Sequence, residues 1–250
     1  MTTLVVGASG ATGQLLVEQL LNQGETVKVI VRSMDSLADS IRQNDRLTIT
    51  EASLLDMSDA QLLTQVENCD AVASCLGHNL TFKGMFGHPK RLVTDAVQRL
   101  CHAIEQTAPA KPIKFILMNT TGNKNTQAGE TVSPAQAIVV GLIRALLPPH
   151  ADNEIAAAYL QKKFGPHQKI IEWAAVRPDS LTDEVSVSEY NIHPSPIRSA
   201  IFDAGQSSRI NVANFMSQLI IDHALWEKWK YKMPVIYNAS FSKKETLPQN

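Results

Sequence analysis

The chain has 250 residues, 44% of them hydrophobic and 19% charged, which is the composition of a globular protein with a sizeable core. Its formal net charge is −1 with basic residues spread along the chain, so a nucleic-acid-binding surface is not expected. No stretch approaches the ~20 apolar residues of a membrane span, and Met1-Thr2-Thr3 lacks the positive charge of a signal peptide.

Short apolar runs alternate with amphipathic segments from the first residues onward. Strands are expected at residues 3–6, 26–31, 47–50, 71–75, 113–118 and 170–176. Helices are expected at residues 11–23, 35–43, 59–67, 89–105, 134–146 and 151–163. Strands that are apolar throughout are usually buried on both faces. The alternation therefore predicts an α/β fold with a doubly wound parallel sheet, the Rossmann fold.

The alternation weakens after about residue 178. One more helix is expected at residues 209–221 and a late strand at 233–237. The whole chain, residues 1–250, is interpreted as a single domain. Within it, residues 178–239 are expected to form a small substrate-side lobe and residues 240–250 a flexible polar tail.

Three glycines follow the first strand directly, in the sequence Gly7-Ala8-Ser9-Gly10-Ala11-Thr12-Gly13, here called the phosphate loop. Glycine permits a sharp turn and lets the backbone approach a pyrophosphate. The free amides and positive dipole end of the next helix would face that anion, and the hydroxyls of Ser9 and Thr12 can add donors. The pattern predicts a dinucleotide site because it lies between a strand and an amphipathic helix.

The end of the second strand indicates which dinucleotide is bound. An acidic residue there would bind the ribose 2′-hydroxyl of NAD, whereas an arginine accommodates a 2′-phosphate. The chain has Val31-Arg32-Ser33, with no carboxylate before Asp35. Arg32 can pair with phosphate and Ser33 can donate a further hydrogen bond. NADP(H) is therefore predicted in preference to NAD(H), with a solvated surface arginine as the alternative.

These motifs resemble the atypical short-chain dehydrogenase/reductase superfamily, in its NmrA-like and biliverdin-IXβ/flavin-reductase-like branch. The resemblance covers most of residues 3–225. It implies that Ser53 and Leu54 flank the adenine, although relatives carry Gly-Asp where this chain has Ala52-Ser53, and Asp56 could equally cap a helix. It also implies that Cys75, Leu76 and Gly77 line the ribose, and that Asn119, Thr120, Thr121 and Pro178 lie by the nicotinamide.

Reductases of the wider superfamily use a tyrosine with a lysine four residues later, and Tyr159 and Lys163 have this spacing. In the family, the spacing before Arg177 places the catalytic tyrosine and lysine near His150 and Glu154 instead. Tyr159 is therefore interpreted as a packing residue. Tyr159 and Lys163 are kept as an alternative catalytic pair that lies outside the family's register. The proton-donating or orienting candidates are Asn119, Thr120 and Thr121, with His150 as an outsider.

Other residues allow more than one interpretation. The loop of residues 78–87, with His78, Asn79 and Lys83, could reach the substrate or be a surface connection. The three cysteines, Cys69, Cys75 and Cys101, lack metal-ligand spacing, which favours reduced thiols in a cytoplasmic protein without a metal site. Trp226, Trp229 and Tyr231 are expected to pack late in the chain or to form an oligomer contact, in a monomer or homodimer.

Two functional hypotheses follow. The first is an NADPH-dependent oxidoreductase of a small planar acceptor such as a flavin or quinone. The second is a non-catalytic NADP(H)-responsive protein that signals redox state through a partner. An epimerase or dehydratase also suits the fold but usually requires the Tyr/Lys pair, so it ranks last.

Overall fold

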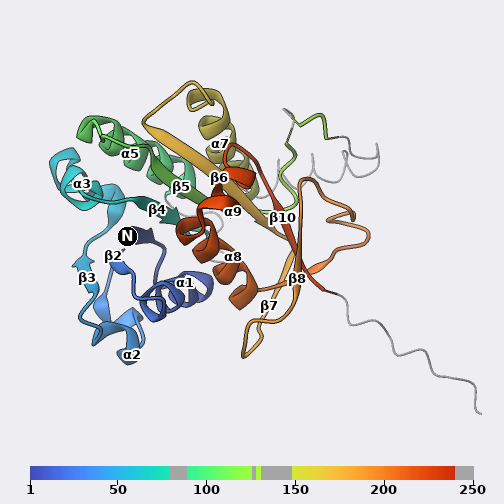
Figure 1. Cartoon of the computed structure of the whole chain (residues 1–250), viewed down its shortest axis with the longest axis horizontal. Coiled ribbons are helices and arrows are strands. Elements are labelled where there is room, and N and C mark those ends of the chain that lie inside the picture. The colour runs from blue at the N-terminus through green and yellow to red at the C-terminus, as the bar shows by residue number, and fades with distance from the viewer. Residues whose placement is uncertain (79–88, 126–127, 131–147, 240–250) are drawn as a thin grey trace, which may run out of the picture.

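The computed structural model describes residues 1–78, 89–125, 128–130 and 148–239 (Figure 1). The predicted helix at 134–146, the predicted tail at 240–250, and Asn79 and Lys83 lie outside these residues. No helix in the described ranges is both long enough and apolar enough to cross a membrane.

The main sheet has eight strands in the order β3-β2-β1-β4-β5-β6-β10-β8. All neighbouring strands are parallel except the last pair, because β8 runs antiparallel to β10. The strands are β1 (Thr2–Val6), β2 (Thr26–Val31), β3 (Leu47–Glu51), β4 (Ala71–Ser74), β5 (Ile113–Met118), β6 (Ile171–Pro178), β8 (Tyr190–His193) and β10 (Val235–Asn238). A second sheet pairs β7 (Ser180–Thr182) in parallel with β9 (Gln206–Ser208). The order reverses direction after β1, which makes the sheet doubly wound and confirms the Rossmann prediction.

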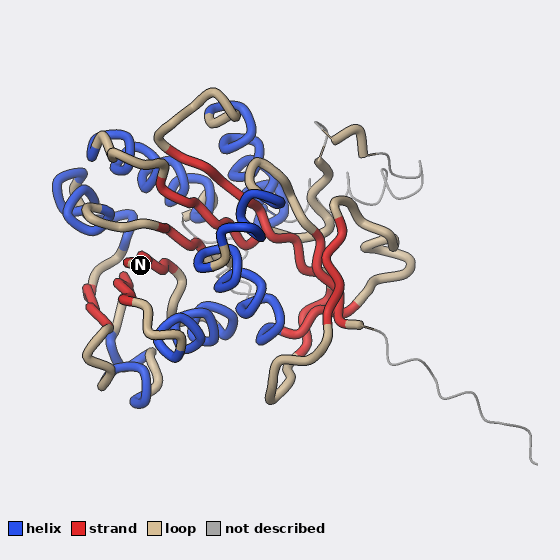
Figure 2. Tube along the Cα trace, viewed as in Figure 1, coloured by secondary structure: helices blue, strands red, loops and turns tan. Residues whose placement is uncertain are grey.

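Helices cover both faces of the sheet (Figure 2). One face carries α3 (Asp59–Val66), α5 (Leu92–Thr107) and α7 (Pro148–Lys163). The other carries α1 (Ala11–Asn22), α2 (Asp39–Arg42), α8 (Arg209–Ile221) and α9 (His223–Trp229). Alternate strand residues serve the two layers: Phe115 of β5 lies in the core on the α5 side, whereas the next residue, Ile116, lies in the core on the α1 side.

The helix predicted at residues 35–43 is interrupted. A single 3-10 turn covers Met34–Ser36, and α2 begins only at Asp39. Between them, Leu37 has extended backbone, and its side chain is 3% exposed and packs in the same core as α1. Burial of this one leucine at the bend therefore outweighs the helical spacing of its polar neighbours.

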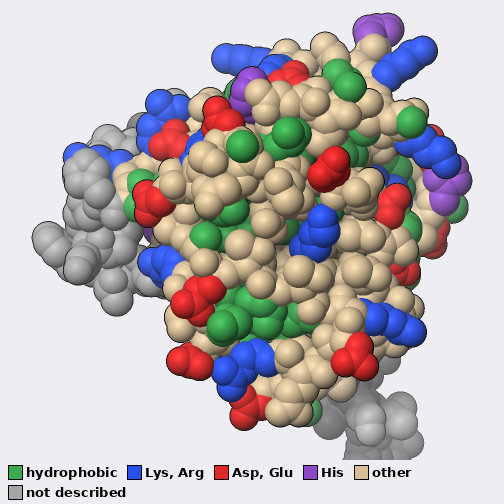
Figure 3. Space-filling model, turned by 90° about the vertical axis from the view of Figure 1, so that its left-hand side faces the viewer, with side chains coloured by type: hydrophobic (Ala, Val, Ile, Leu, Met, Phe, Trp, Pro, Cys, Tyr) green, Lys and Arg blue, Asp and Glu red, His purple; other side chains and the backbone are tan. Residues whose placement is uncertain are grey.

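The C-terminal third contributes to the main sheet, to the helices that cover it and to the second sheet. Helix α8 spans the residues predicted for it and packs against α1, while Trp226 and Trp229 of α9 are buried in the same core. The short strands β7, β8 and β9 were not predicted. Strands β7 and β9 lack the apolar alternation that identifies a strand, and the alternation of β8 extends over only 4 residues. On the opposite edge, beside β3, acidic and basic side chains are interspersed (Figure 3).

Candidate cofactor-binding site

The phosphate loop is built so closely that two of its glycines cannot be replaced without movement. Gly7 has φ +77°, and a methyl group on it would lie 2.6 Å from the carbonyl carbon and oxygen of Cys75. A methyl group on Gly13 would lie 2.1 Å from the carbonyl oxygen of Gly7. The amide of Gly10 donates to that same oxygen at 3.0 Å. The loop therefore turns tightly between the end of β1 and the first turn of α1.

The N-terminus of α1 has no partner from the described chain for its first amides. Gly10 is the N-cap and supplies no side-chain hydrogen bond, and the first turn carries no acidic residue. By contrast, α3 has a complete capping box formed by Ser58 and Gln61, and Asp222 caps α9. An uncapped helix end beside a glycine loop is suited to binding a phosphate group. The loop thus fits a pyrophosphate.

A cleft of about 710 Å³ opens beside this loop, at the carboxyl ends of the first four strands. It contains nine of the residues predicted to bind cofactor, namely Gly7, Ser9, Gly10, Arg32, Ser53, Leu54, Cys75, Leu76 and Gly77. Ser36, Pro89 and Leu92 also line it, although no motif in the sequence indicates a role for them there. Among the other predicted residues, Ala11 is exposed, whereas Thr12 is buried and is not part of the lining.

Arg32 lies at the end of β2, exposed, in the lining of this cleft. Within the described ranges its guanidinium makes no hydrogen bond or ion pair, whereas nearby Asp35 is paired with Arg42 at 3.0 Å. Ser33 accepts a hydrogen bond from the amide of Asp35 at 3.3 Å, so its oxygen stabilises the following turn. A free cation therefore stands where the ribose of a dinucleotide is expected.

The polar residues that follow β5 are engaged with the protein itself. The Asn119 amide nitrogen donates to the carbonyl oxygen of Asn153 at 3.0 Å, and its Oδ1 accepts from the amide of Thr120 at 2.8 Å. Asn119 is 6% exposed. Thr120 accepts a hydrogen bond from the amide of Gly122 at 3.3 Å. Asn119 is thus a structural link between the end of β5 and α7.

Asp179 directly follows Pro178 at the end of β6, and the sequence analysis did not single it out. Its carboxylate accepts hydrogen bonds from the amides of Ser180 and Gly205, both at 2.9 Å. Burial raises the pKa of Asp179, and these hydrogen bonds oppose the shift only in part. The amide of Thr121 donates to the carbonyl oxygen of Pro178 at 3.0 Å, so Thr121 and Asp179 lie together at the ends of β5 and β6.

Tyr159 and Lys163 lie at the packing surface between α5 and α7 and do not line the cleft. Lys163 donates to the Tyr159 hydroxyl at 3.2 Å and to Glu105, near the end of α5, at 2.6 Å. The ring of Tyr159 packs edge-on against Phe164. Burial raises the pKa of Tyr159 despite the nearby ammonium group, which is the opposite of what a proton-donating tyrosine requires.

His78 ends the β4 side of the cleft and is held by a buried carboxylate. Its Nε2 lies 2.8 Å from Oδ2 of Asp152 on α7, and the two side chains are 3% and 1% exposed. The same carboxylate accepts the first amides of α5, from Val93 at 2.8 Å and Thr94 at 2.9 Å. Asp152 therefore caps α5 from another helix, a role that no spacing in the sequence could indicate.

Nearby, burial raises the pKa of the Cys75 thiol to about 12, so this cysteine is not a nucleophile at neutral pH.

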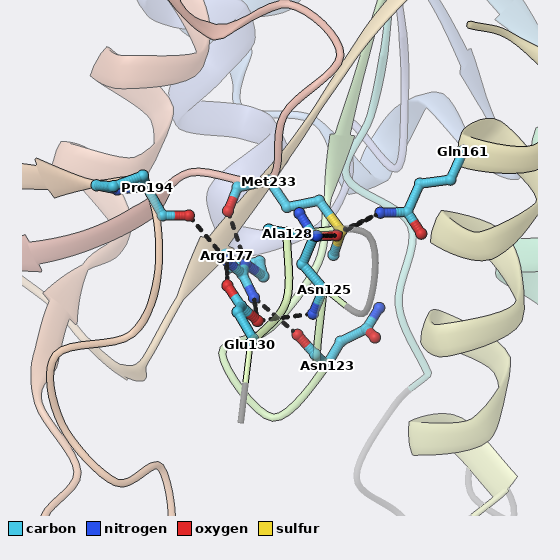
Figure 4. Close-up of polar contacts among 8 residues, drawn as sticks. All are labelled: Asn123, Asn125, Ala128, Glu130, Gln161, Arg177, Pro194 and Met233. Atoms are coloured by element: carbon cyan, nitrogen blue, oxygen red, sulfur yellow. Dashed lines mark hydrogen bonds and ion pairs between the residues drawn. The ribbon is translucent and has the colours of Figure 1, made fainter. Parts of the chain in front are cut away.

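Arg177 anchors the segment that follows β5 (Figure 4). The guanidinium is fully buried and forms two hydrogen bonds with Glu130, at 2.7 and 2.9 Å. It also donates to the carbonyl oxygens of Asn123 at 2.9 Å and Met233 at 2.8 Å. Burial alone would raise the pKa of Glu130, but hydrogen bonds from Arg177, the Asn125 amide and Ser195, together with the charge of Arg177, hold it below its usual value.

A doubly wound sheet, a tight glycine loop and an uncapped helix end that open on one cleft define a dinucleotide-binding protein of the Rossmann class. Residues 7–223 match the NAD(P)H-binding protein family, and the chain belongs to this family. Comparison with curated protein sequences gives no match.

Solved structures share the fold over nearly their whole length. A short-chain dehydrogenase/reductase from Veillonella parvula DSM 2008, in complex with NADP, is 14% identical with a TM-score of 0.69, covering 96% of this chain and 95% of that one. The anaerobillin reductase ChuY from Escherichia coli O157:H7 is 15% identical with a TM-score of 0.68, covering 97% and 99%. A protein assigned as an NADH-flavin reductase from Streptococcus pneumoniae TIGR4 is 17% identical with a TM-score of 0.65, covering 96% and 100%.

Proposed function

We propose that this protein is an NADPH-dependent oxidoreductase that transfers hydride to a small planar acceptor such as a flavin or a quinone. The observation that carries the choice of NADPH is the exposed Arg32 at the end of β2, without an ion-pair partner in the described residues. A guanidinium there can form charge-assisted hydrogen bonds with a 2′-phosphate, which NADPH has and NADH lacks.

Different residues that line or adjoin the cleft would bind different parts of the cofactor. Main-chain amides of residues 11–13 would hold the diphosphate, and Arg32 the 2′-phosphate. Because the strand order runs from β2 through β1 and β4 to β5 and β6, the nicotinamide would lie towards Thr120, Thr121 and Asp179. NADPH supplies the hydride when bound.

A planar acceptor suits a site without a tyrosine acid. Hydride transfer to a flavin or quinone depends mainly on holding the acceptor against the nicotinamide, so a strong proton donor is not required. Tyr159 lies outside the cleft, in keeping with such a reaction. Two proteins with the same fold are named as reductases of small organic molecules, one an anaerobillin reductase and the other assigned as an NADH-flavin reductase.

The test of cofactor choice is Arg32→Asp, with NADH as the internal control. Loss of a charged, phosphate-directed hydrogen bond weakens binding by about 1.5–3 kcal/mol, so NADPH affinity should fall roughly 10- to 150-fold. NADH affinity should not fall, because NADH has no 2′-phosphate. Titration of cofactor fluorescence measures both. An unchanged ratio of the two affinities would remove Arg32 from the site.

Turnover is tested separately. Stopped-flow absorbance at the reduced-nicotinamide band follows oxidation of bound NADPH by flavins, quinones and linear tetrapyrroles. The proposal expects rapid oxidation by at least one of these classes. Failure with every acceptor would leave a binding protein rather than a reductase.

The engagement of Asn119 and Tyr159 with other protein groups favours one second candidate, a non-catalytic sensor of the NADP⁺/NADPH ratio. A sensor must distinguish the two redox forms, since only a difference in affinity can shift a conformational equilibrium. Calorimetric titration with NADP⁺ and with NADPH measures that difference. Equal affinities combined with measurable turnover would exclude the sensor.

A further inference from the structure

The turn after β3, residues 52–57, forms one wall of the cleft, and it is fixed from outside by a single arginine. Ala52, Ser53, Leu54, Leu55 and Asp56 all line the cleft. The neighbouring wall is the end of β2, which carries Arg32 and is paired with β3. If the ribose lies at the end of β2, the base attached to it must lie against this next wall.

We propose that Arg99 of α5 is a positioning residue that sets the adenine-binding wall of the cleft. Its Nη1 donates to the carbonyl oxygens of Leu54 at 3.2 Å and Leu55 at 2.7 Å. Its Nη2 donates to the carbonyl oxygen of Met57 and to a carboxylate oxygen of Asp59 at 3.1 Å. One guanidinium thus holds three carbonyl groups of the turn and the first residue of α3.

The turn needs this support because its own hydrogen bonds are few. A single 3-10 turn covers Leu54–Asp56, and within it the Asp56 amide donates to the Ser53 carbonyl oxygen at 2.9 Å. The carbonyls at the end of such a turn have no partner further along a helix and carry the negative end of its dipole. Leu54 and Met57 anchor the turn in the core, but apolar contacts do not define which way the backbone faces.

Helix α5 is a firm support for this arginine. Leu92 also lines the cleft, and Arg99, seven residues later, lies on the same face of the helix. The first amides of α5 are held by the buried carboxylate of Asp152, so the helix is fixed at its start. The wall is therefore positioned by a side chain that does not line the cleft. The inference requires only that the cleft binds an adenine dinucleotide, and depends neither on the role of Arg32 nor on turnover.

The test compares the two halves of the cofactor in Arg99→Gln. ADP-ribose carries the adenine, whereas reduced nicotinamide mononucleotide does not. Arg99→Gln should weaken ADP-ribose about tenfold, because a neutral amide cannot hold three carbonyls, and should leave the mononucleotide within twofold. Arg99→Lys keeps the positive charge but not the planar set of N–H donors, so its ADP-ribose affinity should fall about threefold. Calorimetry measures the first ligand and fluorescence the second.

Arg209→Gln is the matched control. The Arg209 side chain is 26% exposed against 25% for Arg99, and it pairs with Asp183 at 2.7 Å on another part of the surface. It should bind both ligands within twofold of the wild type.

Two results would overturn the proposal. One is ADP-ribose affinity within twofold of the wild type in Arg99→Gln. The other is an equal loss of both ligands together with a lowered melting temperature, which is the mark of a merely structural residue. If Arg99→Gln does not fold, Arg99→Lys is measured in its place. A fall in ADP-ribose affinity without a fall in mononucleotide affinity then supports the proposal, and unchanged affinities overturn it. Failure of the wild type itself to bind ADP-ribose would instead count against the cofactor site.

Discussion

Replacing Gly13 by alanine places a methyl carbon 2.1 Å from the carbonyl oxygen of Gly7. An ordinary contact of this kind is 3.4–4 Å, so the loop and the first turn of α1 must separate by more than ~1 Å. In most helices a change from glycine to alanine stabilises by roughly 1 kcal/mol. Here the clash involves main-chain atoms, and the cost of such overpacking is about 1–3 kcal/mol.

We expect the clash to prevail in Gly13→Ala. The free energy of unfolding should fall by about 2 kcal/mol, once the gain in helix propensity is subtracted from the upper end of the overpacking cost. Cofactor affinity should fall by at least tenfold, about 1.4 kcal/mol, because the amides that face the diphosphate are displaced with the loop. Urea denaturation measures the first quantity and titration of NADPH fluorescence the second.

Two other glycines give matched controls. A methyl group on Gly10 would lie 3.3 Å from the same Gly7 oxygen, a tight but tolerable distance, and one on Gly165 would meet nothing within 4 Å. Gly10→Ala should therefore lose clearly less affinity than Gly13→Ala, and Gly165→Ala none. If Gly13→Ala is as stable as the wild type and binds NADPH within twofold, the steric reasoning is refuted.

Glu130→Gln leaves the fully buried Arg177 without its carboxylate partner, and it should lower the free energy of unfolding by about 3 kcal/mol in urea melts. The control is Asp203→Asn, which removes an exposed ion pair with Arg198 and should leave the urea midpoint unchanged. The pKa of Glu130 lies below its ordinary value of 4.5, so the contribution of its carboxylate to the free energy of unfolding is complete above pH 4.5 and is lost as the pH falls through the folded-state pKa. If the stability of Glu130→Gln and of the wild type depended on acid pH in the same way, this prediction would be wrong. Tyr159→Phe removes one hydrogen bond from Lys163, so it should cost at most ~1 kcal/mol and leave NADPH affinity and any turnover within twofold; a large loss of turnover alone would restore Tyr159 as the proton donor.

Most strands and helices of the first half, and helix α8, could be predicted because local pattern and tertiary burial agree there; the interrupted helix at residues 35–43 is the exception. Strands β2 and β5 and helix α8 occupy the predicted residues, and β1, β3, β4, α1 and α3 differ by one residue at an end. Strands β7 to β9 could not be predicted, because their few polar residues form ladders only where the main body brings them together.

The candidate site divides in the same way. Residues that depend on their position after a strand, such as Gly7, Arg32 and Ser53, were found from the sequence and line the cleft. Asp152, Asp179 and Arg99 were not, because each acts on residues that are far away in the chain. Asn119 was predicted as a candidate for chemistry, but whether its amide is free or bound to α7 depends on a packing contact that no motif records.

The sequence by itself determined the sheet, the phosphate loop and the positive charge at the end of β2, since each follows from a few adjacent residues and the steric freedom of glycine. Only the tertiary structure decided which polar side chains hold the walls of the cleft in place. The physical reason is that hydrogen bonds between distant segments, such as those from Arg99 to the turn after β3, depend on how helices pack against the sheet, and this packing is not encoded in any local pattern.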